Sequence, residues 1–280
     1  MGDLWNRSFV LNLGGTRVAS ETVDGARNEL LRVVFKVEAS LAKAVNTADI
    51  SVYNLAETTR AKVATKGLAT TLEVGYSGRS FQIFGGKLEA GKSKREGVDW
   101  VTSFQSTDGG QQLRAARVNL SFKRVSAVEA FGRVADTLGL GLGNAVQKMR
   151  EGNIRGALEQ FENGIVLSGS SQRELDRLAR TFGYNWSVQN GQLQLLGPLD
   201  GIEPGDAIVL NSNSGMIGSP ESGEKGIVEV RSLLIPQLTP GRIVELQARQ
   251  IKGNFRVEKV TYQGDTRGKE WYADLELKPR

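Results

Sequence analysis

The chain has 280 residues, a formal net charge of +5, and neither cysteine nor histidine. The lack of both residue types excludes disulfides, thiolate metal sites, thiol nucleophiles and every mechanism that needs an imidazole base. Carboxylate, lysine or tyrosine chemistry remains, together with cation sites built from oxygen ligands. The composition therefore favours a role without catalysis.

The remaining composition is typical of a globular protein with about two domains, at roughly 150 residues each. Glycine is abundant, at 34 residues beside only six prolines, which predicts many tight turns between short strands. The N-terminus lacks the basic and apolar segments of a signal peptide. No apolar run reaches the roughly 18 residues that span a bilayer. We expect a protein made in a cytoplasm, without membrane insertion.

Residues 1–112 are predicted to form an antiparallel β domain. Apolar and polar side chains alternate there with the period of half-buried strands. A short helix over 56–66, ended by Gly67, is expected to interrupt the strands. The alternating runs are Leu31–Glu38, Ile50–Tyr53, Leu72–Tyr76 and Trp100–Gln105.

Residues 113–200 change to a helical period. Two stretches begin with the spacing of a capping box, continue with apolar side chains on one helix face and end at a glycine. These are Ser126 to Gly139 and Ser171 to Gly183. Asn190-Gly191, between two alternating runs, predicts a β-hairpin. For residues 140–168 the pattern fits either a loop or a short amphipathic helix.

Residues 201–280 return to short strands, and Pro240-Gly241 and residues 264–268 supply turns. About 80 residues of this kind suit a small barrel or sandwich. The predicted fold class is mainly β with a smaller α/β part. The four alternating runs are Val228–Val230, Val244–Ala248, Phe255–Val257 and Trp271–Leu277.

Two glycine motifs resemble nucleotide-binding patterns. Residues 86–93, GKLEAGKS, match GxxxxGK[ST], but that loop needs a helix starting at the lysine. Residues 94–97 lead directly into the β run around Trp100, so we interpret the match as a strand followed by a basic hairpin loop. Gly139 to Gly143 follows a helix and is interpreted as a helix stop and linker, whereas a dinucleotide fingerprint follows a strand.

The other candidate residues have no spacing that is specific to one function, so we assign no catalytic, cofactor-binding or metal-binding residue. A glycosidase needs only two carboxylates, but the aspartates stand where local backbone hydrogen bonds are favoured. The tryptophans are spread over the chain, as expected of core or interface anchors. The basic residues are scattered too, which disfavours a nucleic-acid module. The residues weighed were Asp49, Asp99, Asp108, Asp206 and Asp265; Trp5, Trp100, Trp186 and Trp271; and the basic cluster Lys92, Lys94 and Arg95.

Segments along almost the whole chain, in the expected order, resemble the baseplate hub proteins of tailed bacteriophages. The C-terminal third carries the resemblance in residues 214–242 and 253–279. Residues 48–60 and 83–110 are similar to the N-terminal half of that family, and residues 171–196 to its middle. The spike hubs of type VI secretion machines are related in architecture.

The resemblance implies two tail-tube-like β-barrel domains, residues 1–112 and 201–280, flanking a helix and hairpin region at 113–200. It implies a homotrimeric ring whose six barrels continue the symmetry of the tail tube. The ring would join that tube to a distal spike or fibre in the virion and enclose the DNA exit channel. Implied partners are the tail tube or distal tail protein, the tape-measure protein and spike or fibre proteins. DNA would only pass through, and no cofactor is implied.

Two alternatives remain open. Some phage hubs carry lytic domains, so a tail-associated cell-wall hydrolase with a carboxylate pair is the first. A basic oligonucleotide-binding barrel, with affinity that falls steeply with salt, is the second. In the hub interpretation, the hairpin at Gly86 to Gly97 is hypothesised to contact a subunit or a neighbouring protein.

Overall fold

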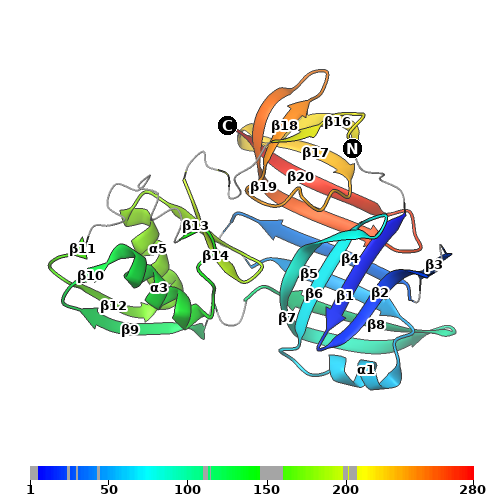
Figure 1. The fold of residues 1–280 in the computed structure, drawn as a ribbon, viewed down its shortest axis with the longest axis horizontal. Helices are drawn as coiled ribbons and strands as arrows, with labels where there is room; N and C mark the ends of the chain where they lie inside the picture. Colours follow the sequence, from blue (N-terminus) through cyan, green and yellow to red (C-terminus); the bar gives the residue numbers. More distant parts are fainter. Residues whose placement is uncertain are drawn as a thin grey trace. The chain divides into compact units, whose positions relative to one another are not determined.

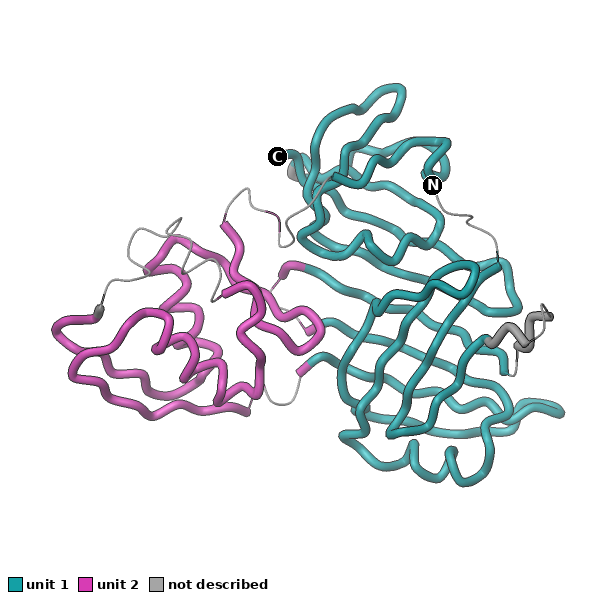
Figure 2. The backbone as a smooth tube through the Cα atoms, viewed as in Figure 1, with its two compact units in different colours: residues 1–40, 46–108, 205–280 teal, residues 41–45, 109–204 magenta. Residues whose placement is uncertain are grey.

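The structure is a computed structural model that describes residues 6–23, 26–29, 31–42, 45–109, 113, 115–145, 160–197, 201 and 207–280. The chain divides into two compact units (Figure 2). Unit 1 comprises residues 1–40, 46–108 and 205–280, and unit 2 comprises residues 41–45 and 109–204. Each unit has its own hydrophobic core.

The elements of each unit are labelled in Figure 1. Unit 1 contains β1 (Arg7–Leu13), β2 (Thr16–Val23), β3 (Ala26–Glu29), β4 (Val33–Ser40), β5 (Thr47–Tyr53), α1 (Glu57–Val63), β6 (Ala69–Tyr76), β7 (Arg79–Glu96), β8 (Asp99–Thr107), β15 (Ile208–Leu210), β16 (Met216–Ser222), the 3₁₀ turn η1 (Glu224–Gly226), β17 (Val228–Leu233), β18 (Ile243–Gln247), β19 (Lys252–Asp265) and β20 (Trp271–Pro279). Unit 2 contains β9 (Arg117–Phe122), β10 (Val125–Ser126), α3 (Ala127–Leu138), β11 (Gln160–Phe161), β12 (Ile165–Ser170), α5 (Ser171–Thr181), β13 (Asn185–Gln189) and β14 (Gln192–Leu196).

The strands of unit 1 form one 14-stranded sheet in the order β16-β17-β20-β19-β4-β5-β8-β7-β6-β1-β2-β3, with β18 joined to β19 and β15 to β18. The pairing of β4 with β19, from Ser40↔Lys259 to Val34↔Asp265, connects the N-terminal strands to the C-terminal ones. The predicted mainly β class is confirmed. Two separate barrel domains are not, because the described strands follow one continuous path without a closed barrel.

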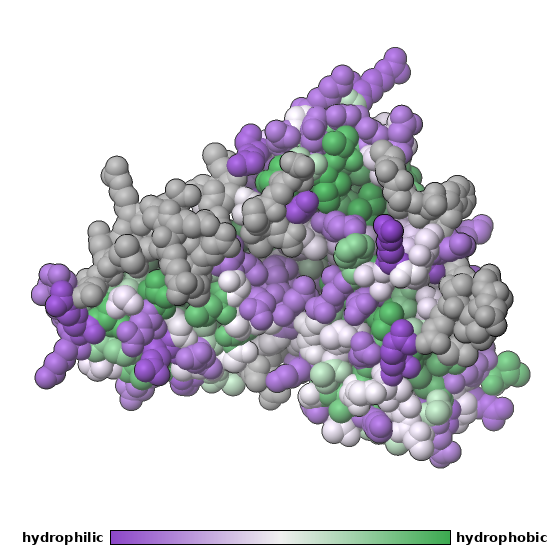
Figure 3. All heavy atoms as spheres, viewed as in Figure 1, coloured by the Kyte–Doolittle hydropathy of each residue, from purple (hydrophilic) through white to green (hydrophobic). Residues whose placement is uncertain are grey.

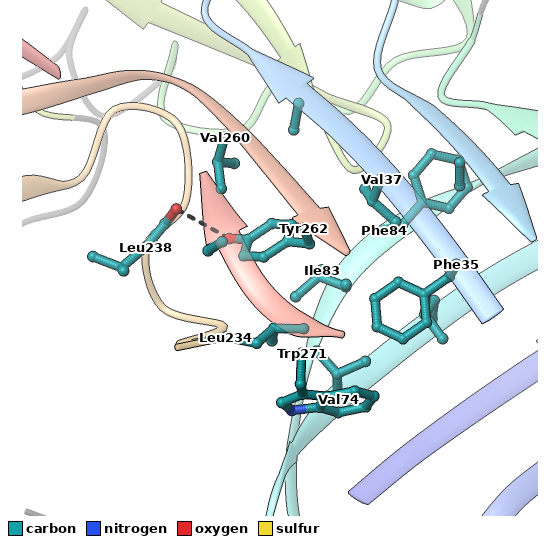
Figure 4. Packing of buried hydrophobic residues seen from close by; sticks show 14 of the residues in the cluster. Phe35, Val37, Val74, Ile83, Phe84, Leu234, Leu238, Val260, Tyr262 and Trp271 are labelled. Atoms are coloured by element: carbon teal, nitrogen blue, oxygen red, sulfur yellow. Dashed lines mark hydrogen bonds between the residues drawn. The ribbon is translucent and has the colours of Figure 1, made fainter. Parts of the chain in front are cut away.

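The core of unit 1 is shared by the two strand regions (Figure 4). Phe35 of β4 packs edge-on against Trp271 of β20, with ring centroids 5.4 Å apart. The hydroxyl of Tyr262 on β19 donates to the carbonyl of Leu238 at 3.0 Å, which fixes the segment before β18 against the sheet. Burial of apolar surface is the main favourable term in folding, so this shared core makes the two strand regions one folding unit.

In unit 2, the first capping box is confirmed. Ser126 precedes α3, and its Oγ accepts a hydrogen bond from the backbone N–H of Glu129 at 3.2 Å. The helix ends at Gly139, which has the left-handed conformation expected of a C-terminal glycine (φ 66°). The predicted hairpin is also present: β13 and β14 flank Asn190 and Gly191, whose φ values of 52° and 75° suit a type I′ turn.

The second predicted capping box was wrong, because the helix begins one residue earlier than predicted and no side chain caps it. The residue before α5 is Ser170, whose side chain makes no capping bond, and Ser171 is already helical. Ser171 is buried, and its Oγ accepts a 2.8 Å hydrogen bond from the Thr137 hydroxyl on α3. The serine therefore joins the two helices. The helix predicted over 56–66 is shorter, at Glu57–Val63. Of residues 140–168, 146–159 lie outside the described residues, and 160–168 contain β11 and the start of β12, so neither the loop nor the helix expected there holds for this part.

None of the helices in the described part of the chain has the length and apolar character needed to cross a membrane.

Candidate interaction surface

The GxxxxGK[ST] match lies entirely within a β-strand. Residues 86–93 are part of β7, which pairs with β6 up to Lys87 and with β8 from Lys87 to Glu96. The strand therefore runs three residues beyond the match, and the predicted basic loop shrinks to a turn at Gly97 and Val98. No helix begins at Lys92, so the backbone amides that would hold a phosphate are not presented there.

Close packing explains why two positions of the match are glycine. A Cβ on Gly91 would lie 2.3 Å from Cγ1 of Val63 and 2.9 Å from its carbonyl oxygen, because α1 packs directly over the strand. A Cβ on Gly86 would lie 2.3 Å from the carbonyl oxygen of Thr107. These glycines allow the helix and the neighbouring backbone to approach β7.

The end of the β7–β8 hairpin presents basic and apolar groups to solvent. The side chains of Lys92, Lys94 and Arg95 are exposed, and Lys94 forms an ion pair with Glu96. Val98 at the turn is 87% exposed, and Figure 3 shows hydrophobic atoms projecting at this tip. The hairpin thus presents an exposed apolar side chain at its turn, next to the closing pair Glu96 and Asp99, with three basic side chains further along β7.

The first two residues of β8, directly after the turn, are fixed to α1 and to the end of β5. The guanidinium of Arg60 on α1 stacks over Trp100, 4.3 Å from the ring centroid. Asn54, after β5, accepts a 3.0 Å hydrogen bond from the backbone N–H of Trp100 and donates a 2.8 Å bond to Asp99. These contacts hold the exposed tip on a rigid support.

A second charged surface, which no sequence pattern indicated, lies on the face of β16, β17, β20 and β19. Strand register aligns Glu221 with Glu229, Glu229 with Glu276, and Glu276 with Lys259. We call Glu221, Glu229 and Glu276 the acidic row. Like charges directly opposite one another on a sheet destabilise it. At one end of the row, Lys259 forms an ion pair with Glu276 at 3.3 Å.

A groove of about 500 Å³ lies along the acidic row. Arg231 of β17 and Asp274 of β20 also line the groove, beside the acidic row. The Nε of Arg231 donates to Asp274 at 2.6 Å, so this cation is already paired. That hydrogen bond raises the pKa of Arg231 above its ordinary value. At the outer strand β16, Ile217 exposes 36% of its surface. The groove therefore combines an excess of acidic over basic side chains with an exposed apolar side chain.

Where the structure describes them, the aspartates considered as a hydrolytic pair each accept a hydrogen bond from a side chain far away in sequence, and not only the local backbone bonds expected from the sequence. Asp206 lies outside the described residues. The described part of the chain contains no group of three or more acidic residues placed to hold a metal ion. The other four of these candidates accept hydrogen bonds from different side chains: Asp49 from Gln105 at 2.9 Å, Asp99 from Asn54 at 2.8 Å, Asp108 from Asn46 at 2.7 Å and Asp265 from Arg32 at 3.0 Å.

The tryptophans also have structural roles where they are described. Trp186 and Trp271 are fully buried, and Trp186 Nε1 donates to Asp176 at 2.7 Å. Trp100 is 38% exposed beneath Arg60. Trp5 lies outside the described residues. The two buried side chains are core anchors, as predicted.

Comparison with solved structures gives full-length matches. The fold is similar to a 43 kDa tail protein of prophage MuSo2 from Shewanella oneidensis, with a TM-score of 0.64, 12% identity and 98% of both chains covered. It is similar to a tail protein from Neisseria meningitidis, with a TM-score of 0.61, 10% identity and coverage of 98% of this chain and 97% of the other.

A third similar structure comes from a secretion machine. It is an Escherichia coli component of the type VI secretion system, described as structurally similar to the bacteriophage T4 tail proteins gp27 and gp5. The TM-score is 0.60 at 11% identity, over 96% of this chain and 76% of the other. No protein-family model and no curated protein sequence matches. The chain therefore has the fold of these tail and type VI secretion proteins.

Proposed function

We propose that this chain is a structural phage tail protein that acts as a baseplate hub. Three copies form a ring that joins the tail tube to a distal spike or fibre and encloses the channel through which DNA leaves. Residues 1–112 and 201–280 provide the two tube-like parts of each subunit, and residues 113–200 form the region between them. The ring contacts the tail tube or distal tail protein and the tape-measure protein.

One observation carries this proposal: the fold matches two tail proteins, one of them from a prophage, over 98% of the chain. A match of that extent includes both strand regions and the helical unit, so it is no local likeness of a single sheet. The sheet of unit 1 supports a building-block role as well, because its long strands tie residues far apart in sequence into one rigid body. Assembly needs such preformed surfaces and no catalytic group.

Electron microscopy of the purified protein and of tail particles tests the proposal. A threefold ring with a central channel, found at the distal end of the tail, is the expected result. A chain absent from particles would overturn the proposal. Peptidoglycan turnover by the purified protein would favour the hydrolase in its place.

A binding measurement tests the interpretation of residues 86–93 separately. Because Lys92 lies on a strand, we expect no ATP binding by calorimetry and no difference between the wild type and Lys92→Ala. ATP binding that Lys92→Ala abolishes would contradict the assignment of this hairpin to assembly.

A further inference from the structure

We propose that the β7–β8 hairpin of one copy docks into the groove of the acidic row on the next copy. The inference rests on the proposed function and deepens it, because it names the two surfaces that meet between neighbouring subunits. The occupant of the groove is thus a second copy of this chain.

Among the described residues, the groove along the acidic row has more acidic than basic side chains. Four acidic and two basic side chains line the groove, and both basic ones are already engaged, Arg231 with Asp274 and Lys259 with Glu276. Glu221 and Glu229 lie opposite each other and have no ion pair among the described residues. Like charges in cross-strand register cost stability, and an external cation would relieve that cost.

The hairpin and α1 carry the complementary charge. Residues 57–66 and 87–99 contain seven basic and four acidic side chains. Lys92 and Arg95 are exposed near the turn. Complementary charge of this kind directs encounter and fixes the orientation of partners. The exposed Val98 at the tip would meet the exposed Ile217 of the groove, so apolar contact accompanies the charge pairing.

The two surfaces cannot meet within one chain. In the sheet order, β17 and β7 are separated by β20, β19, β4, β5 and β8. Figure 1 shows the hairpin and β16–β17 at opposite ends of unit 1. A contact between different patches on two copies is heterologous, and such contacts close into a ring when the rotation between copies permits it. The geometry points to a head-to-tail interface.

Charge reversal tests this interface by sedimentation of the full chain over a range of concentrations. Glu221→Lys with Glu229→Lys, and separately Lys92→Glu with Arg95→Glu, should each raise the dissociation constant of the assembly by about tenfold or more. Combining all four substitutions should restore much of the association, because the charges are again opposite. Added salt should weaken wild-type assembly as it screens these charges.

Matched controls are Arg133→Glu and Asp136→Lys on the exposed face of α3, which should leave association unchanged. Assembly unaffected by either double reversal, or reduced by both and not recovered by the fourfold variant, overturns the docking. A wild-type chain that is monomeric at every concentration also overturns it, even if microscopy finds that chain in tails, in which case the tail role stands. Absence from tails overturns the proposed function instead.

Discussion

The guanidinium of Arg32, directly before β4, is held by the carboxylate of Asp265 at the end of β19, with Nε 3.0 Å from Oδ1 and Nη2 2.5 Å from Oδ2. Thr266 follows Asp265 in the loop between β19 and β20, and its hydroxyl accepts a 3.0 Å hydrogen bond from the backbone N–H of Val33. Arg7 of β1 donates to the carbonyl of Gly268 at 2.7 Å. Three N-terminal residues thereby fix one C-terminal loop.

Replacement of Asp265 by Asn should lower the free energy of unfolding by about 2 kcal/mol at pH 7, because it removes the charge from this paired site. Urea unfolding followed by tryptophan fluorescence measures the change. Asp136→Asn on α3 is the control and should stay within about 0.5 kcal/mol of the wild type. Equal effects of the two substitutions would show that the pairing contributes no stability.

The same pair should make stability depend on pH. Burial acts to raise the pKa of Asp265, but hydrogen bonds from Arg32 and the backbone, with the charge of Arg32, outweigh it and leave the pKa below its ordinary value. The contribution is therefore complete above about pH 4, the unfolded value, and is lost as pH falls through the folded-state pKa. Urea midpoints between pH 7 and pH 3 should fall more steeply for the wild type than for Asp265→Asn; parallel curves would contradict this assignment.

The packing around Gly91 leaves no space for even a methyl side chain. A Cβ there overlaps Val63 at 2.3 Å, so Gly91→Ala should destabilise by about 1–3 kcal/mol as α1 is pushed away. Gly132→Ala on α3 is a matched comparison, since its Cβ finds its nearest heavy atom at 3.8 Å. It should stabilise by about 0.5–1 kcal/mol through helix propensity. Thermal unfolding separates the two outcomes, and a neutral Gly91→Ala would show that α1 yields without cost.

Local signals in the sequence predicted the elements that local chemistry determines. Alternation over 31–38 located β4, Ser126 located the start of α3, and Asn190-Gly191 located the turn between β13 and β14. Ser171 had the same local pattern as Ser126 but bonds Thr137 of another helix. A tertiary hydrogen bond of that kind leaves no periodic trace in the sequence.

Long-range pairing could not be predicted, and both the sheet and the candidate surface depend on it. The N-terminal and C-terminal strands looked like separate domains because nothing local signals that Val37 pairs with Tyr262. The acidic row was missed for the same reason: Glu221, Glu229 and Glu276 align only once three strands are in register. The order of the family-like segments indicated the likeness to tail proteins that the structural comparison found, but not the single continuous sheet.

The cap at Ser126 provides a test within unit 2. Ser126→Ala removes the oxygen that accepts from Glu129 N–H and should cost about 1 kcal/mol of unfolding free energy. Ser170→Ala, at the equivalent position before α5, should be close to neutral because that side chain makes no capping bond. Chemical denaturation monitored by circular dichroism compares them. A larger loss for Ser170→Ala would contradict the assignment of the caps.

Tyr262 tests whether the shared core of unit 1 holds the segment that precedes β18. Its buried hydroxyl donates to the carbonyls of Pro236 at 3.2 Å and Leu238 at 3.0 Å. Tyr262→Phe would leave both carbonyls without this donor and should cost about 1–2 kcal/mol. Tyr272→Phe, half-buried on the neighbouring strand, is the control and should change little. Hydrogen exchange at residues 234–242 should accelerate only in Tyr262→Phe; unchanged exchange would mean that apolar packing alone positions the segment.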